Sequence, residues 1–199
     1  MIQQADERAL AAGTTTDKIF DMLEKNKEHF HVPMVFMTYI NVIFVYGIEK
    51  FAKRTKEIGM AGVIVPDMPF EEKEELDQVF RRYDLDVISL IAPTSKERIK
   101  AIAAEAQGFI YCVSSLGVTG VRDNISQGVA EMVREVKKVK DIPCAVGFGI
   151  STPEQAENMA AVSDGVIVGS AIVRIVGEYG RECVEKVGEY VRSMKEALG

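Results

Sequence analysis

The chain has 199 residues, of which 47% are hydrophobic and 27% charged, and its formal net charge is −6 at pH 7. This length and apolar content allow one substantial hydrophobic core and exclude a disordered chain. Lysine and arginine residues are scattered along the chain, so the sequence disfavours nucleic-acid binding. No window approaches the roughly 18 consecutive apolar residues of a membrane span, and the first residues lack a secretory pattern. The three cysteines lack metal-binding spacing, so we expect no metal site. Their odd number and wide separation favour reduced thiols, and we therefore expect a cytoplasmic protein.

Short apolar runs rich in valine and isoleucine recur along the chain and are typical of strands buried on both faces. They predict strands over Val32–Met37, Gly62–Val65, Val87–Ile91, Gly108–Val113, Cys144–Val146 and Gly165–Val168. Helical periodicity predicts helices over Thr16–Phe30, Ile48–Ile58, Glu71–Tyr83, Lys96–Ala106, Ala130–Lys138, Pro153–Ala160 and Tyr179–Leu198. This alternation favours an α/β fold with a parallel sheet and outer helices, in a single domain over residues 1–199.

Two of the apolar runs end in glycine, each just before a signal for the start of a helix. Gly147-Phe148-Gly149 follows one run, and Gly169-Ser170 follows the next. Glycine lets backbone N–H groups approach a ligand closely because it has no Cβ atom. In a (β/α)8 barrel, the loops after the seventh and eighth strands form a phosphate site together with a helix N-terminus. The alternative is two ordinary turns, but their occurrence in tandem favours a phosphate site.

Several segments of the sequence resemble the tryptophan synthase alpha subunit family. They are Gln3–Gly13, Tyr39–Gly47, Val65–Glu72, Tyr111–Arg122, Val146–Gln155 and Gly169–Val173, in the order of the family and over the full length of the chain. The resemblance implies a (β/α)8 TIM barrel. The six predicted strands then correspond to the third to eighth strands of that barrel, so we expect the first two βα units to be missing.

The resemblance also implies a lyase of tryptophan biosynthesis. The family cleaves indole-3-glycerol phosphate into indole and glyceraldehyde 3-phosphate in a retro-aldol reaction, and indole then passes to a beta subunit. The family's two acids, a glutamate and an aspartate, precede the position that matches Ile2. Among the acids present, Asp67 alone is predicted at the carboxyl end of a strand, and the resemblance assigns it to the partner surface. We therefore expect no catalytic residue in this chain and no activity of the chain alone.

The other site residues are assigned by resemblance to substrate binding. Tyr39 and Tyr111 line the indole pocket, Phe148 encloses the glycerol phosphate, Thr119 and Gly120 belong to a lid, and Gly147, Gly149, Gly169 and Ser170 bind the phosphate. For the two tyrosines the residues themselves leave a second interpretation open. A tyrosine at a strand end often covers the core and keeps its hydroxyl in water.

A beta subunit is the partner that the resemblance implies, in an alpha2beta2 hetero-tetramer. Asn41, Phe44, Asp67 and Pro69 match the face that docks it, while Val45 stands where the family often has asparagine. We expect pyridoxal phosphate only in that partner and no cofactor in this chain. The competing hypothesis is a non-catalytic module that binds a phosphorylated ligand or the beta subunit.

Overall fold

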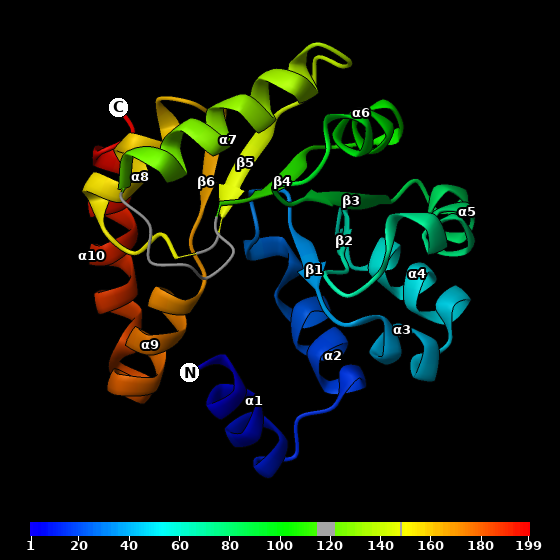
Figure 1. Cartoon of the computed structure of the whole chain (residues 1–199). Coiled ribbons are helices and arrows are strands. Elements are labelled where there is room, and N and C mark those ends of the chain that lie inside the picture. Colours follow the sequence, from blue (N-terminus) through cyan, green and yellow to red (C-terminus); the bar gives the residue numbers. More distant parts are fainter. Residues whose placement is uncertain (115–121, 148) are drawn as a thin grey trace. The chain divides into compact units, whose positions relative to one another are not determined.

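The computed structural model describes residues 1–114, 122–147 and 149–199, and for residues 122–126 it describes the backbone only (Figure 1). Contacts divide the chain into two compact units. We call Ala9–Leu90 the N-terminal unit, and Met1–Arg8 together with Ile91–Gly199 the C-terminal unit. The single domain expected from the sequence stays a prediction. In the part of the chain that is described, no helix combines the length and the apolar character needed to cross a membrane.

The N-terminal unit is built on parallel strands that follow one another in chain order. β1 (Val35–Met37) pairs with β2 (Gly62–Ile64), which pairs with β3 (Asp86–Ile91). Its helices are α2 (Thr16–Asn26), α3 (Ile40–Tyr46), α4 (Ile48–Glu57) and α5 (Glu74–Arg82), with short 3-10 helices over Lys27–His29 and Phe70–Glu72. Aromatic rings fill much of its core, where Phe20 contacts Phe36 and Phe51 edge to face.

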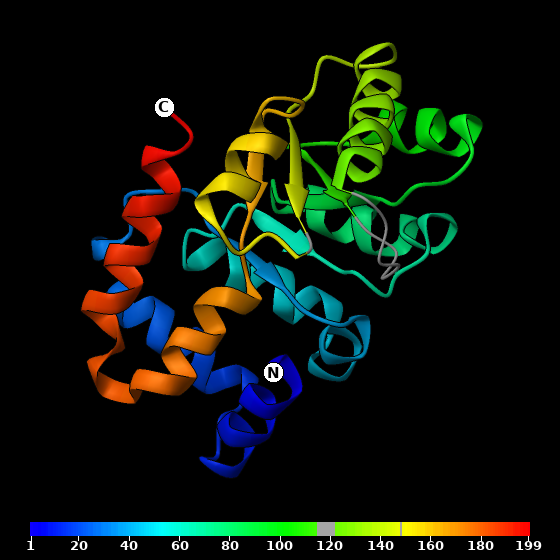
Figure 2. The ribbon, with the colours of Figure 1, turned by 60° about the vertical axis from the view of Figure 1, so that its left-hand side comes forward.

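The C-terminal unit repeats the same parallel arrangement. β4 (Ile110–Val113) pairs with β5 (Cys144–Gly147), which pairs with β6 (Gly165–Ile167). Its helices are α6 (Lys96–Glu105), α7 (Arg122–Lys137), α8 (Pro153–Ala160), α9 (Ser170–Tyr179) and α10 (Cys183–Glu196), with a 3-10 turn over Gly180–Glu182. α9 and α10 pack side by side (Figure 2). Helix α1 (Ile2–Ala11) begins the chain.

Local sequence signals explain where several of these elements begin. The Ser95 hydroxyl accepts a hydrogen bond from the Arg98 amide at the start of α6. At α8, Thr152 and Gln155 form a capping box, and Pro153 follows at the first helical position, where its missing N–H costs nothing. Asp164 joins the starts of two strands, because its carboxylate accepts the Cys144 amide at 2.8 Å.

All six predicted strands are present, with ends that differ from the predicted ones by up to three residues. The strand predicted from Val32 begins at Val35, since Pro33 interrupts the run and Val32 is exposed. The closing helix was predicted from Tyr179 and begins at Cys183. Gly180, at a φ of 53°, ends α9 before it. Helices α1, α3 and α9 were not among the predicted helices, although the start of a helix was expected after Gly169. The α/β class is confirmed, while the assignment of the strands to the third to eighth of a barrel stays a prediction.

Candidate functional site

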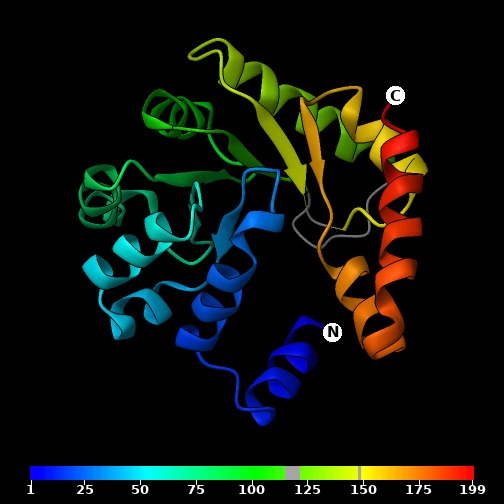
Figure 3. The same cartoon turned by 180° about the vertical axis from the view of Figure 1, so that it is seen from behind.

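The glycine-ended strands of the C-terminal unit lie next to each other. β5 and β6 are parallel and in register, with Gly147 opposite Ile167 (Figure 3). Because both strands run in the same direction, the segments that follow them leave the sheet at the same edge. Gly149 and Gly169 therefore come from adjacent strand ends, as the sequence predicted. Both residues are exposed.

Gly147 has a different environment from the two exposed glycines, because it is buried beneath Tyr111. A Cβ atom at this position would collide with the hydroxyl group and the ring of Tyr111. The absence of a side chain at residue 147 is thus required by a protein contact. Tyr111 is only 8% exposed, and its burial raises the pKa of its phenol above the ordinary value. The structure brings these two predicted site residues together.

The two helices that follow these strands have unlike N-termini. At α8, the Thr152 hydroxyl accepts the Gln155 amide, and the Gln155 side chain accepts the amides of Ser151 and Thr152. At α9, Gly169 is the N-cap and provides no side-chain hydrogen bond. Within the described residues, the amides of Ser170 and Ala171 have no hydrogen-bond partner. Since free N–H groups at a helix N-terminus attract anions, α9 is better suited than α8 to bind phosphate.

The predicted partner residues form an exposed surface of the N-terminal unit. Asn41, Phe44 and Val45 lie on one face of α3, at the i, i+3 and i+4 spacing, and all three are exposed. Tyr39 is 61% exposed and occupies the N-cap position of α3. On the connection after β2, Pro69 and Asp67 are exposed, and the Asp67 carboxylate accepts the Ile40 amide at 3.0 Å.

Thr119, Gly120 and Phe148 lie outside the described residues, so their assignment to the substrate site stays a prediction. Tyr39 and Tyr111 belong to different units, and each is described within its own unit. In the described part of the chain, no group of three histidine, cysteine, aspartate or glutamate side chains is placed to hold a metal ion.

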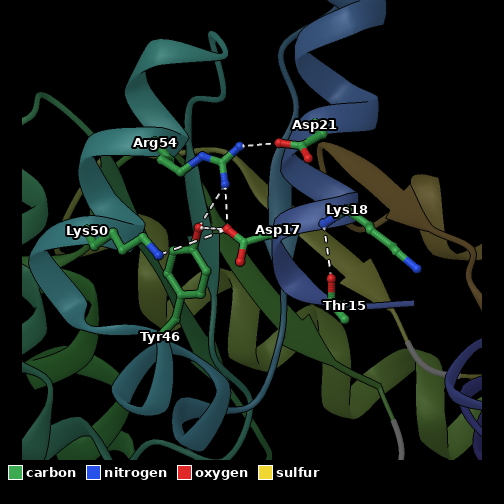
Figure 4. Close-up of polar contacts among 7 residues, drawn as sticks. All are labelled: Thr15, Asp17, Lys18, Asp21, Tyr46, Lys50 and Arg54. Carbon is green, nitrogen blue, oxygen red and sulfur yellow. Dashed lines mark hydrogen bonds and ion pairs between the residues drawn. The ribbon is translucent and has the colours of Figure 1, made fainter. Parts of the chain in front are cut away.

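One polar cluster of the N-terminal unit was not singled out from the sequence. Asp17 on α2 accepts hydrogen bonds from Tyr46 at 2.5 Å and from Arg54 at 2.7 Å, and Arg54 also binds Asp21 at 2.7 Å (Figure 4). Lys50 lies over the Tyr46 ring, 4.1 Å from its centroid. The i, i+4 spacing of Asp17 with Asp21 and of Lys50 with Arg54 is the signal that could have indicated two matching charged faces.

Parallel strands that alternate with helices, together with glycines at two adjacent strand ends, define a TIM-barrel-like α/β protein. The family described as tryptophan synthase alpha chain matches residues 1–199. The tryptophan synthase alpha chain of Lacticaseibacillus casei is 43% identical over 198 residues, which span 100% of this chain and 74% of that protein. That of Geobacillus stearothermophilus is 47% identical, in a comparison that spans 99% of this chain and 77% of that protein.

Solved structures agree with these sequence relatives. The tryptophan synthase alpha subunit of Campylobacter jejuni superposes with a TM-score of 0.85 at 36% identity, covering 92% of this chain and 73% of that one. A chain of the tryptophan synthase α2β2 complex of Pyrococcus furiosus gives a TM-score of 0.87 at 34% identity, covering 98% and 79%. The chain therefore belongs to the tryptophan synthase alpha chain family, a family of lyases in tryptophan biosynthesis.

Proposed function

We propose that the protein acts in the retro-aldol cleavage of indole-3-glycerol phosphate to indole and glyceraldehyde 3-phosphate. The family match over residues 1–199 carries this proposal. In the reaction, the bond between the indole ring and the glycerol chain breaks and the ring carbon takes up a proton. A glycerol hydroxyl loses its proton as the aldehyde forms, and the ring N–H proton is removed and returned. Groups that move these protons have to lie beside the substrate.

The phosphate group would bind at the carboxyl ends of β5 and β6. The amides of Ser170 and Ala171, which have no acceptor among the described residues, support this placement, since they add to the positive end of the helix dipole. The exposed Gly149 and Gly169 leave room for the phosphate oxygens. Tyr111 would border the indole ring from the neighbouring strand β4. By the family resemblance, Tyr39, Thr119, Gly120 and Phe148 would also belong to substrate binding.

Residues 1–199 would bind the substrate without cleaving it by themselves. The family resemblance places the two acids in two βα units that correspond to no residue of this sequence. Asp67 accepts the Ile40 amide through one carboxylate oxygen, and the family resemblance assigns it to the partner surface. The chain would need no cofactor of its own, since proton transfer by carboxylates is sufficient for the retro-aldol step.

Indole would pass to a beta subunit that carries pyridoxal phosphate, in a cytoplasmic α2β2 assembly. The relative from Pyrococcus furiosus is part of such a complex, which supports the same partnership here. The exposed Asn41, Phe44, Asp67 and Pro69 would form the docking surface on this chain. An exposed face of this kind, with a large aromatic side chain, is typical of a protein interface.

Substitution of Gly169 by valine tests the phosphate site. A Cβ atom at residue 169 meets no described protein atom within 4 Å, so a collision of that atom with the protein would not be the cause of a loss of binding. We expect Gly169→Val to abolish binding of sn-glycerol 3-phosphate and of inorganic phosphate in a calorimetric or chemical-shift titration.

Gly165→Val is the matched control, because Gly165 begins β6, whereas Gly169 follows the other end of that strand, and a Cβ atom at residue 165 also meets open space. We expect this variant to bind both ligands as the unsubstituted chain does. Equal affinity of Gly169→Val and the unsubstituted chain would place the phosphate elsewhere and contradict the proposed site.

A further inference from the structure

Helix α3 is short and depends on contacts outside itself for its order. It has seven residues, and isolated helices of that length are unstable in water. At its C-terminal end Gly47, with a φ of 95°, donates its amide to the carbonyls of Ile43 and Phe44. The Ile43 side chain is fully buried and fixes the inner face of the helix. The N-terminal end of α3 therefore also needs a stabilising contact from outside the helix.

The N-terminal end of α3 is capped by a residue from another connection. Its N-cap residue is Tyr39, which makes no side-chain capping bond. Serine, threonine, aspartate and asparagine are the usual caps, because their side chains accept a free amide of the first turn. Here the Asp67 carboxylate accepts the Ile40 amide at 3.0 Å. Its negative charge also complements the positive end of the helix dipole.

The connection that carries Asp67 is itself anchored at both ends. Val65 is 2% exposed and accepts the Met68 amide at 3.4 Å. At the far end, the buried Lys73 forms an ion pair of 3.2 Å with the buried Asp77. Asp67 therefore lies on an ordered segment, and its hydrogen bond to the Ile40 amide can fix the position of the start of α3.

The capped end of α3 lies at the start of the proposed docking surface. Tyr39 immediately precedes Ile40, and Asn41 immediately follows it. Phe44 and Val45, which are 52% and 89% exposed, lie about one turn further along the same face. A change in the direction of α3 at Ile40 would thus displace each of these side chains.

We propose that Asp67 is a positioning residue, whose carboxylate caps α3 and so holds the exposed α3 face in the orientation that binds the beta subunit. This inference rests on the proposed function for the identity of the partner. The capping contact itself is independent of that partner and can be tested without it. Asp67 would then contribute to binding through Asn41 and Phe44, in addition to its own place on the docking surface.

Three single variants separate capping from charge. Asp67→Ala removes the acceptor, and Asp67→Asn retains an acceptor without the charge. Glu72→Ala removes one negative charge from the same connection, five residues further along the chain. In the free chain, we expect Asp67→Ala to accelerate hydrogen exchange of the Ile40 amide about fivefold or more. We expect Asp67→Asn to retain most of the protection and Glu72→Ala to retain all of it.

The affinity for a purified tryptophan synthase beta subunit is the second measurement. Asp67→Ala should lower it about fivefold to tenfold, whereas Asp67→Asn and Glu72→Ala should bind nearly as tightly as the unsubstituted chain. If Asp67 acts through α3, its effect shrinks when Phe44 is already alanine, so the double variant loses less than the product of the two single losses. If Asp67 instead acted independently of Phe44, the loss of affinity in the double variant would equal the product of the two single losses.

Two results would overturn the proposal. The first is unchanged Ile40 exchange in Asp67→Ala, and the second is an equal loss of affinity in Asp67→Ala and Glu72→Ala. Absence of binding by the unsubstituted chain would instead contradict the proposed beta-subunit partnership. The exchange data then decide by themselves whether Asp67 orders α3.

Discussion

At the scale of single residues, two glycines are required by contacts with a neighbouring strand. A side chain at Gly147 would collide with Tyr111, and one at Gly62 would collide with the backbone of Asp86. Neither requirement comes from an unusual backbone conformation, because both glycines lie inside parallel strands. Their conformational freedom is therefore not the reason for glycine at these positions. The reason is the close approach of another part of the chain.

Substituting Gly147 by alanine should destabilise the C-terminal unit by about 1–3 kcal/mol, the usual cost of overpacking a filled site. The Tyr111 ring would have to move away from β5 to make room for the new methyl group. Urea unfolding followed by circular dichroism measures the change. Gly165→Ala, on the adjacent strand, is the control, since a Cβ atom there meets open space. Equal unfolding midpoints for the two variants would show that Tyr111 does not restrict residue 147.

At the scale of elements, the charged cluster of Figure 4 joins α2 to α3 and α4. Asp17 and Asp21 on α2 face Tyr46 and Arg54, and Arg54 also stacks on the Phe20 ring at 4.7 Å. The hydrogen bond from Tyr46 is the main cause that lowers the pKa of Asp17, and Lys50 and Arg54 add to it. A single exposed ion pair contributes little to the free energy of unfolding. In this cluster, however, several donors share the carboxylate of Asp17.

The lowered pKa of Asp17 makes the stability of the N-terminal unit depend on pH. The ionised carboxylate is favoured in the folded chain, so its contribution is fully present above its ordinary pKa of 3.8. It is lost as the pH falls below that value. We expect Asp17→Asn to lower the urea midpoint at pH 7 and to have a smaller effect at pH 3. Other carboxylates titrate equally in both proteins, so their effects cancel in the difference. An effect of Asp17→Asn that is the same at both pH values would contradict this role.

At the scale of the whole molecule, β1 and β6 each have one pairing partner within their own unit. β1 pairs with β2 and β6 with β5 in the described part of the chain. The relatives are longer, and this chain spans 74% of the Lacticaseibacillus casei protein. An open strand edge is able to accept a further strand. The family resemblance implies that two additional βα units pair there and carry the catalytic acids.

Joining the first two βα units of a relative to residues 1–199 should raise the urea midpoint and produce cleavage of indole-3-glycerol phosphate. Residues 1–199 alone should show no cleavage above background, since positioned acids and bases contribute roughly 10²–10⁴-fold each. Release of indole measures the reaction, and an extended chain without the added glutamate is the control.

Two outcomes would contradict this expectation. Cleavage by residues 1–199 alone, abolished by replacing a residue of this chain, would reveal a substitute acid. An extended chain that binds glycerol phosphate but does not cleave the substrate would favour the non-catalytic module.

The sequence by itself determined the order of the strands, the α/β class and the family. These depend on local patterns, such as the valine-rich runs and the glycines after β5 and β6, which each stretch of chain carries alone. The caps at Ser95 and Thr152 are equally local, because each cap and the amide whose hydrogen bond it accepts are three residues apart. The sequence did not indicate α3, whose apolar sequence lacks a clear helical period and whose order depends on its surroundings.

Only the tertiary structure decided which distant residues meet. The Asp67 carboxylate reaches the Ile40 amide across 27 residues, and Asp17 reaches Arg54 across 37. The collision of a Gly147 side chain with Tyr111 arises because β4 and β5 are adjacent and in register. Such contacts are set by strand pairing and helix packing, which local residue patterns do not encode. For that reason the sequence assigned Gly147 to phosphate binding, which stays a prediction, and only the structure showed that a Cβ atom at residue 147 would collide with Tyr111.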